Sequence, residues 1–220
     1  MHRRHMLLAL GAAAVPGAAL ADIQRVPLSK AFGLLDTYLA LPVGERNRFY
    51  LAYRAMKDKH PYPGAAATVV SVTGARFPVQ FDASGLVLRL PSLSDLKSGA
   101  MFESADPGLR LGLEARAAIA PATRIDVGAL VLALAQANAA VAKIAGPLAL
   151  MAPKLTAAYF PDAGAGSAQL ADGRTVPLPI TNAPFVGAVT YIEPALLAGA
   201  RTVVLTRAPS RILIGGHPKG

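Results

Sequence analysis

The sequence of 220 residues contains no cysteine and no tryptophan, and it has only four histidines. The absence of cysteine excludes disulfides, thiolate nucleophiles and cysteine-ligated zinc or iron–sulfur sites. The fold must therefore be stabilised by the burial of apolar side chains. Charged residues make up 16% of the chain and aromatic residues 6%, so aliphatic side chains must supply most of the core.

The first 21 residues have the layout of a cleavable export signal. A basic start at Met1–His5 is followed by an uncharged run, Met6–Leu20, and small residues lie at Ala19 and Ala21 before Asp22. The apolar run is too short to span a membrane. We expect cleavage between Ala21 and Asp22, which leaves residues 22–220 as the mature protein.

Two adjacent arginines bear on the export route. Arg3-Arg4, followed after one residue by Met6-Leu7-Leu8, resembles the twin-arginine signal of bacterial export. His2 departs from that pattern, which usually has a small hydroxyl residue there. An ordinary general secretory signal with neighbouring basic residues is the alternative, and both routes predict a periplasmic or secreted protein.

The mature chain is basic, and its cations are concentrated in one segment. It has 20 basic and 13 acidic residues, a net charge of about +7. For an exported protein this charge favours anionic envelope components, such as lipid head groups, over nucleic acid as partners. The candidate binding residues are Arg46, Arg48, Tyr50, Arg54, Lys57, Lys59 and Tyr62. Alternatively, Phe49, Tyr53 and Met56 form an apolar helical stripe with the cations on its solvated face.

The periodicity of the chain predicts an α+β fold with antiparallel sheets. We expect helices within 29–58, the second of them over 45–58, because breakers follow at 60–64. Further along, Asp126 caps the most clearly periodic helix, which covers 126–145. Polar residues interrupt this helix, so it is a core helix and the mature chain has no predicted transmembrane span. The predicted strands are 67–72, 77–81, 86–90, 109–119, 153–160, 201–207 and 211–214.

Two pairs of segments suggest an internal repeat. Residues 80–91 can be aligned with 169–179, and residues 110–117 with 201–208. The chain would then consist of two similar halves of about 90 residues, 26–121 and 125–215. Chance similarity in a chain rich in Ala, Leu and Pro is the alternative.

Few residues offer catalytic chemistry. Only His60 and His217 remain as imidazole bases in the mature chain. Ser94–Lys97 matches the S-x-x-K pattern of penicillin-binding proteins and β-lactamases. The companion motifs of those enzymes are missing, so we expect Ser94 to cap a helix. Glu103 and Asp106 lie beside a loop and are expected to cap or solvate it. No metal-ligand or nucleotide-binding pattern occurs, so we expect no metal or cofactor.

These observations favour a non-enzymatic, exported binding or envelope-associated protein. Its partner would be an anionic envelope component or another periplasmic protein. One alternative is a small hydrolase of cell-wall or lipid esters with His60 as its base. Another is a lipid carrier or chaperone-like protein whose apolar groove includes Leu130 and Leu134.

Overall fold

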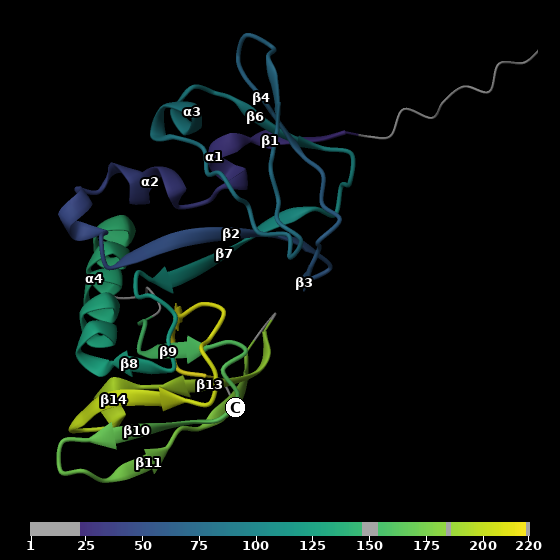
Figure 1. The fold of residues 1–220 in the computed structure, drawn as a ribbon. Helices are drawn as coiled ribbons and strands as arrows, with labels where there is room; N and C mark the ends of the chain where they lie inside the picture. Colours follow the sequence, from purple (N-terminus) through teal and green to yellow (C-terminus); the bar gives the residue numbers. More distant parts are fainter. Residues whose placement is uncertain (1–22, 147–153, 184–185, 219–220) are drawn as a thin grey trace, which may run out of the picture.

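The computed structural model describes residues 23–146, 154–183 and 186–218, and it confirms the α+β fold (Figure 1). The helices are α1 (Leu28–Ala31), α2 (Leu35–Ala40), η1 (Val43–Glu45), α3 (Leu93–Lys97), α4 (Val127–Ala145) and η3 (Pro194–Leu196). The strands up to residue 117 are β1 (Gln24–Pro27), β2 (Phe49–Lys57), β3 (His60–Pro61), β4 (Thr68–Val70), β5 (Arg76–Pro78), β6 (Met101–Ser104) and β7 (Arg110–Ala117). The later strands are β8 (Arg124–Asp126), β9 (Ala157–Phe160), β10 (Gly166–Leu170), β11 (Thr175–Pro177), β12 (Ile180–Ala183), β13 (Gly187–Ile192), β14 (Ala200–Leu205) and β15 (Leu213–Gly215).

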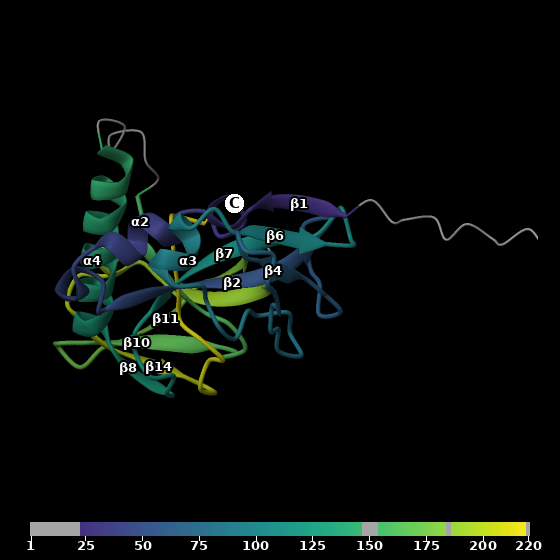
Figure 2. The same ribbon diagram turned by 90° about the horizontal axis from the view of Figure 1, so that it is seen from above.

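The strands form three antiparallel sheets. The N-terminal sheet has the order β1-β6-β4-β5, and the C-terminal sheet has the order β8-β14-β10-β11. Figure 2 shows β1, β6 and β4 of the N-terminal sheet on the side of the molecule away from α4. The central sheet has the order β12-β13-β9-β15-β7-β2-β3, and it joins the two parts of the chain where Leu213 of β15 pairs with Arg116 of β7.

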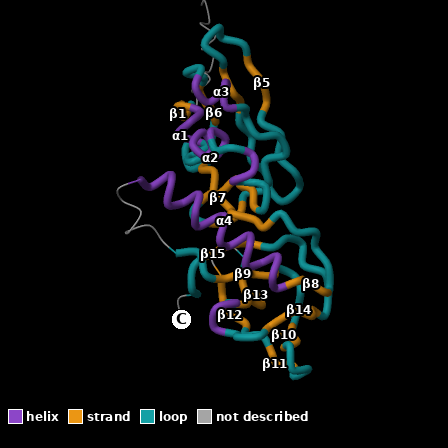
Figure 3. The backbone as a smooth tube through the Cα atoms, turned by 90° about the vertical axis from the view of Figure 1, so that its left-hand side faces the viewer, coloured by secondary structure: helices purple, strands orange, loops and turns teal. Residues whose placement is uncertain are grey.

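Helix α4 lies on one side of the molecule (Figure 1), and seen from that side it runs between the α1–α3 region and the C-terminal sheet (Figure 3). The Asp126 side chain caps it, as predicted, by accepting a hydrogen bond from the Gly128 amide at 2.8 Å. Among the described residues it is the one helix long and apolar enough to cross a membrane. Its buried face instead belongs to the main core, and Asn138 hydrogen-bonds both backbone groups of Leu155. The helix is therefore packed as a core element.

The predicted helix over 45–58 is wrong, because residues 49–57 form strand β2. All of this strand except Lys57 pairs with β7, from Phe49 opposite Ala117 to Met56 opposite Arg110. Phe49, Leu51 and Tyr53 face the main core, and residues of the opposite face such as Ala52 are buried too. A strand buried on both faces has no polar alternation, so its apolar residues also fit a helical spacing.

The segments aligned as an internal repeat occupy different positions in the two parts of the chain. The turn at 82–85 lies between Phe81 and Val87, which form an isolated bridge, whereas the turn at 172–173 joins β10 to β11. Likewise, 110–117 form β7 of the central sheet, but 201–205 belong to β14 of the C-terminal sheet. The alignment is therefore not supported, and the repeat itself stays a prediction. The N- and C-terminal sheets nevertheless order their strands in the same way along the chain.

Candidate ligand-binding cavity

The predicted cationic and aromatic patch does not form one surface. Because β2 is extended, Arg46 and Lys59 lie at opposite ends of a strand about 30 Å long. At one end, the Arg46 guanidinium lies over the Tyr38 ring, 5.3 Å from its centroid, and Nε donates to the Leu41 carbonyl at 3.1 Å. Arg48 is exposed, and its backbone amide donates to Gln136 of α4 at 2.7 Å.

The other predicted residues lie along β2 or at its far end. Lys57 pairs with Asp106 at 2.7 Å, and its ammonium lies 5.3 Å from the centre of the half-buried Tyr62 ring. Lys59 is exposed in the tight turn between β2 and β3, with φ +65°. Tyr50 is exposed on the face of the central sheet opposite to the main core.

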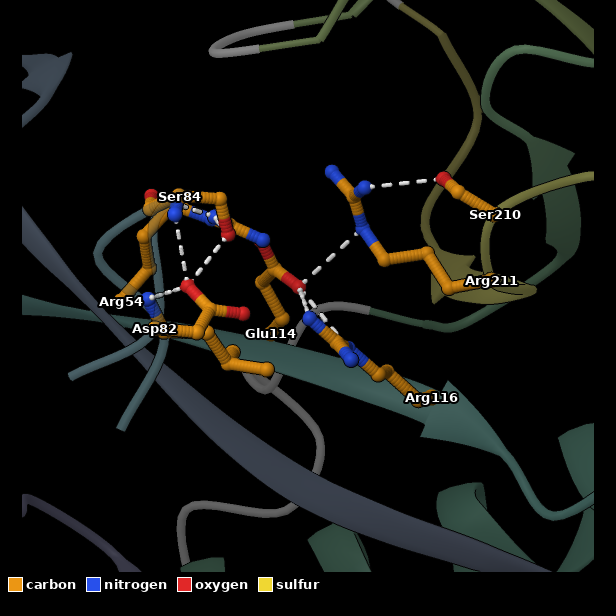
Figure 4. A network of polar contacts seen from close by, with 8 residues as sticks. Arg54, Asp82, Ser84, Glu114, Arg116, Ser210 and Arg211 are labelled. Atoms are coloured by element: carbon orange, nitrogen blue, oxygen red, sulfur yellow. Dashed lines mark hydrogen bonds and ion pairs between the residues drawn. The ribbon is translucent and has the colours of Figure 1, made fainter. Parts of the chain in front are cut away.

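Arg54 belongs to a charged cluster on that same face of the central sheet (Figure 4). Its Nε donates to Glu114 at 2.9 Å, and its Nη1 donates to both oxygens of Ser84. Arg116 binds the other Glu114 oxygen, with Nη2 at 2.5 Å, and Arg211 Nε lies 3.3 Å from that oxygen. Three guanidinium groups thus surround one carboxylate.

The charges of this cluster depend on one another. Burial raises the pKa of Glu114, but the hydrogen bonds from Arg54 and Arg116 outweigh it, and the pKa lies below its usual value. Burial lowers the pKa of Arg211, the negative charge of Glu114 opposes this effect, and the neighbouring guanidinium groups lower the pKa further, so that it lies below its usual value. Since Arg54 and Arg116 are each only 7% exposed, we assign this cluster to stabilisation of the fold.

The catalytic candidates are not brought together. His60 is exposed on the edge strand β3, and His217 lies 2.8 Å from Glu193 near the end of the chain. Ser92, and not Ser94, caps α3, because its hydroxyl accepts from the Asp95 amide in a capping box. Glu103 is buried and pairs with Arg25 and Arg76 on the outer face of the N-terminal sheet.

Two further predictions concern metals and cleavage. Among residues 23–146, 154–183 and 186–218, no group of three histidine or acidic side chains is arranged to hold a metal ion. The predicted cleavage site at Ala21 and Asp22 lies outside the described residues.

A cavity of about 460 Å³ lies between the inner face of the N-terminal sheet and the α1 and α3 region. This volume is in the range of small-molecule sites, about 300–1,000 Å³. Its apolar lining includes Leu28, Phe32, Val69, Phe77, Leu90 and Ala100. Leu28 and Phe32 are fully buried, whereas Phe77 is more than half exposed, so the cavity opens to solvent on the Phe77 side.

The cavity lies where only the short helix α1 follows the first strand of the N-terminal sheet. Helix α1 follows β1 as α4 follows β8, but α1 has four residues and α4 has 19. The helical conformation is interrupted between α1 and α2 at Leu34, whose φ of +68° is in the left-handed region. The Tyr53 hydroxyl donates to the Gly33 carbonyl at 2.7 Å, which satisfies a backbone group at the break. The interrupted helix leaves space over Val69 of the sheet.

One polar residue of the lining lies on α3, and the others lie in loops. They are Ser71, Gln80, Arg89, Asp95 and Ser98. The Asp95 carboxylate already accepts hydrogen bonds from Ser92, which lower its pKa, and the positive charge of Arg89 lowers it further. Arg89 is exposed and is the one cationic residue of the lining. The cavity therefore combines apolar walls with a cationic group.

Sequence analysis missed this cavity. Leu130 and Leu134, where the lipid-carrier alternative places its groove, are both buried in the main core. The cavity-lining residues come from five separate segments between Leu28 and Ala100. The only local signal was the Gly33-Leu34 pair inside the predicted first helix, where the helix breaks. Comparison with known protein families, curated proteins and solved structures finds no match to this chain.

Proposed function

We propose that the protein is an exported, non-enzymatic binding protein that holds an amphipathic small molecule. The apolar part of the ligand occupies the 460 Å³ cavity, and an acidic head group interacts with Arg89 and Gln80. The observation that carries the proposal is the combination, in one cavity, of an apolar wall that includes the fully buried Leu28 and Phe32 and of an exposed cation. The proposed function combines the predicted binding protein with its lipid-carrier alternative.

Export is part of the proposal and rests on residues 1–21. Mass measurement of the protein recovered from the periplasm of its own host tests it. We expect a chain that begins at Asp22. A full-length chain that stays in the cytoplasm contradicts this part of the proposal.

Native mass spectrometry of the same sample tests for a retained ligand. We then expect the ligand-free protein to bind lauric acid in isothermal titration calorimetry. Val69→Trp fills the cavity from β4 and should weaken binding at least tenfold, which corresponds to about 1.4 kcal/mol. Val70→Trp is the matched control, because the neighbouring side chain of the same strand points to the opposite face of the sheet.

The two variants make the outcome specific. Binding by wild type and Val70→Trp, with loss in Val69→Trp, supports the cavity as the site. Equal loss in both variants, or no binding of lauric acid by wild type, contradicts the proposal. Thermal unfolding of each variant verifies that it is folded.

The hydrolase alternative depends on His60 alone. The exposed position of His60 on an edge strand does not favour this alternative. A panel of ester substrates compared between wild type and His60→Ala tests that alternative, and we expect no activity that depends on His60.

A further inference from the structure

Exposed apolar side chains gather at the border of the cavity. Seven large apolar side chains in the described part of the chain are more than half exposed, and three of them, Val72, Phe77 and Leu88, border this cavity. Phe77 lines it directly. Val72 Cγ1 lies 3.4 Å from the position that a Cβ atom on Gly99 would occupy, and Gly99 lies between the lining residues Ser98 and Ala100. The amide of Leu88 donates to the carbonyl of Gln80, which also lines the cavity.

Cations accompany these side chains. Arg89 follows Leu88 and lines the cavity, and the exposed Lys97 ends α3 beside the lining residue Ser98. The nearest carboxylate, Asp95, accepts hydrogen bonds from Ser92 and keeps its negative charge, so Arg89, Lys97 and Asp95 together carry a net charge of +1. The border is therefore apolar with a small excess of positive charge.

We propose that this border docks on an anionic lipid bilayer, so that the ligand passes between the bilayer and the cavity. Val72, Phe77 and Leu88 enter the boundary between head groups and acyl chains, while Arg89 and Lys97 pair with lipid phosphates. The mature chain's net charge of about +7 favours the same surface. The proposal rests on the proposed function, since it assigns the source of the amphipathic ligand.

The experiment is co-sedimentation of the mature protein with vesicles of phosphatidylglycerol and phosphatidylcholine, compared with vesicles of phosphatidylcholine alone. We expect binding to the anionic vesicles, and weaker binding as salt is added. The variant Val72→Asp with Leu88→Asp should bind these vesicles at least tenfold more weakly. Its matched control is Val43→Asp with Leu196→Asp, which changes two similarly exposed apolar side chains of η1 and η3 that do not belong to the border.

Lauric acid titration separates this proposal from the proposed function. Neither Val72 nor Leu88 lines the cavity, so the uncharged variant Val72→Ser with Leu88→Ser, which adds no carboxylate beside Arg89, should keep the affinity of wild type for lauric acid. If wild type binds lauric acid but not the anionic vesicles, docking is overturned and the cavity function stands. Docking is also overturned if the Val72→Asp, Leu88→Asp variant binds the anionic vesicles as well as wild type does. The same holds if the Val43→Asp, Leu196→Asp control loses as much vesicle binding as that variant. If the aspartate variant does not fold, Val72→Ser with Leu88→Ser is measured in its place.

Discussion

At the scale of single residues, Glu114 is the central charge of the cluster on the face of the central sheet opposite to the main core. Its two carboxylate oxygens accept hydrogen bonds from Arg54 and Arg116, and Arg211 lies close to one of them. Removal of this charge would leave three partly buried guanidinium groups without a neutralising partner. Such a loss is costly in a protein interior.

We expect Glu114→Gln to lower the free energy of unfolding by about 3 kcal/mol. Urea unfolding measures the change. Glu45→Gln is the control, because Glu45 and Lys143 form an exposed pair and the expected loss is at most about 1 kcal/mol. Similar losses in the two variants would contradict the structural role of the Glu114 cluster.

The same residue predicts a pH dependence. The pKa of Glu114 is lower in the folded protein than its usual value, so its contribution to stability is complete above about pH 5. The contribution is lost as the pH falls through the folded pKa, because the unfolded chain then binds the proton first. We expect the stability of Glu114→Gln to fall less steeply than that of wild type below about pH 4.5, measured as urea midpoints across pH. Parallel curves would contradict this prediction.

At the scale of elements, α4 was predictable because its signals are local. The cap at Asp126, the apolar periodicity and the end at Gly146 all lie within or beside the helix. Strand β2 was not predictable in the same way. Its identity depends on β7, whose first residue, Arg110, is 53 positions after Lys57, and both faces of β2 are buried. Only the partner strand distinguishes it from a helix.

The cap of α4 can be tested directly. We expect Asp126→Ala to destabilise the protein by about 1 kcal/mol, because the amide of Gly128 loses its acceptor. Asp126→Asn keeps a capping oxygen and should remain close to wild type. Chemical denaturation of both variants gives the comparison, and equal stability of Asp126→Ala and wild type would contradict the role of the cap.

At the scale of the whole molecule, the two parts of the chain share one sheet and one core. The central sheet contains strands from both, joined at β7 and β15, and the main core extends from Leu28 to Ile214. Each part contributes strands and buried apolar residues to this shared sheet and core. The similar order of the N- and C-terminal sheets therefore does not make them independent units.

This arrangement predicts one cooperative unfolding transition. Differential scanning calorimetry should give equal calorimetric and van't Hoff enthalpies, and circular dichroism in the far and near ultraviolet should follow the same curve. Two separated transitions would contradict a single cooperative unit and favour two domains.

The sequence by itself determined the features that depend on neighbours along the chain. These are a core without disulfides, the α+β class and the capped helix α4. The tertiary structure decided which residues meet across long separations. It made β2 a strand, separated the predicted basic patch, gathered three arginines around Glu114, and formed a cavity where a short helix covers a sheet. The physical reason is that caps and turns are stabilised by groups a few residues apart, whereas strand pairing and cavities arise only when distant segments pack.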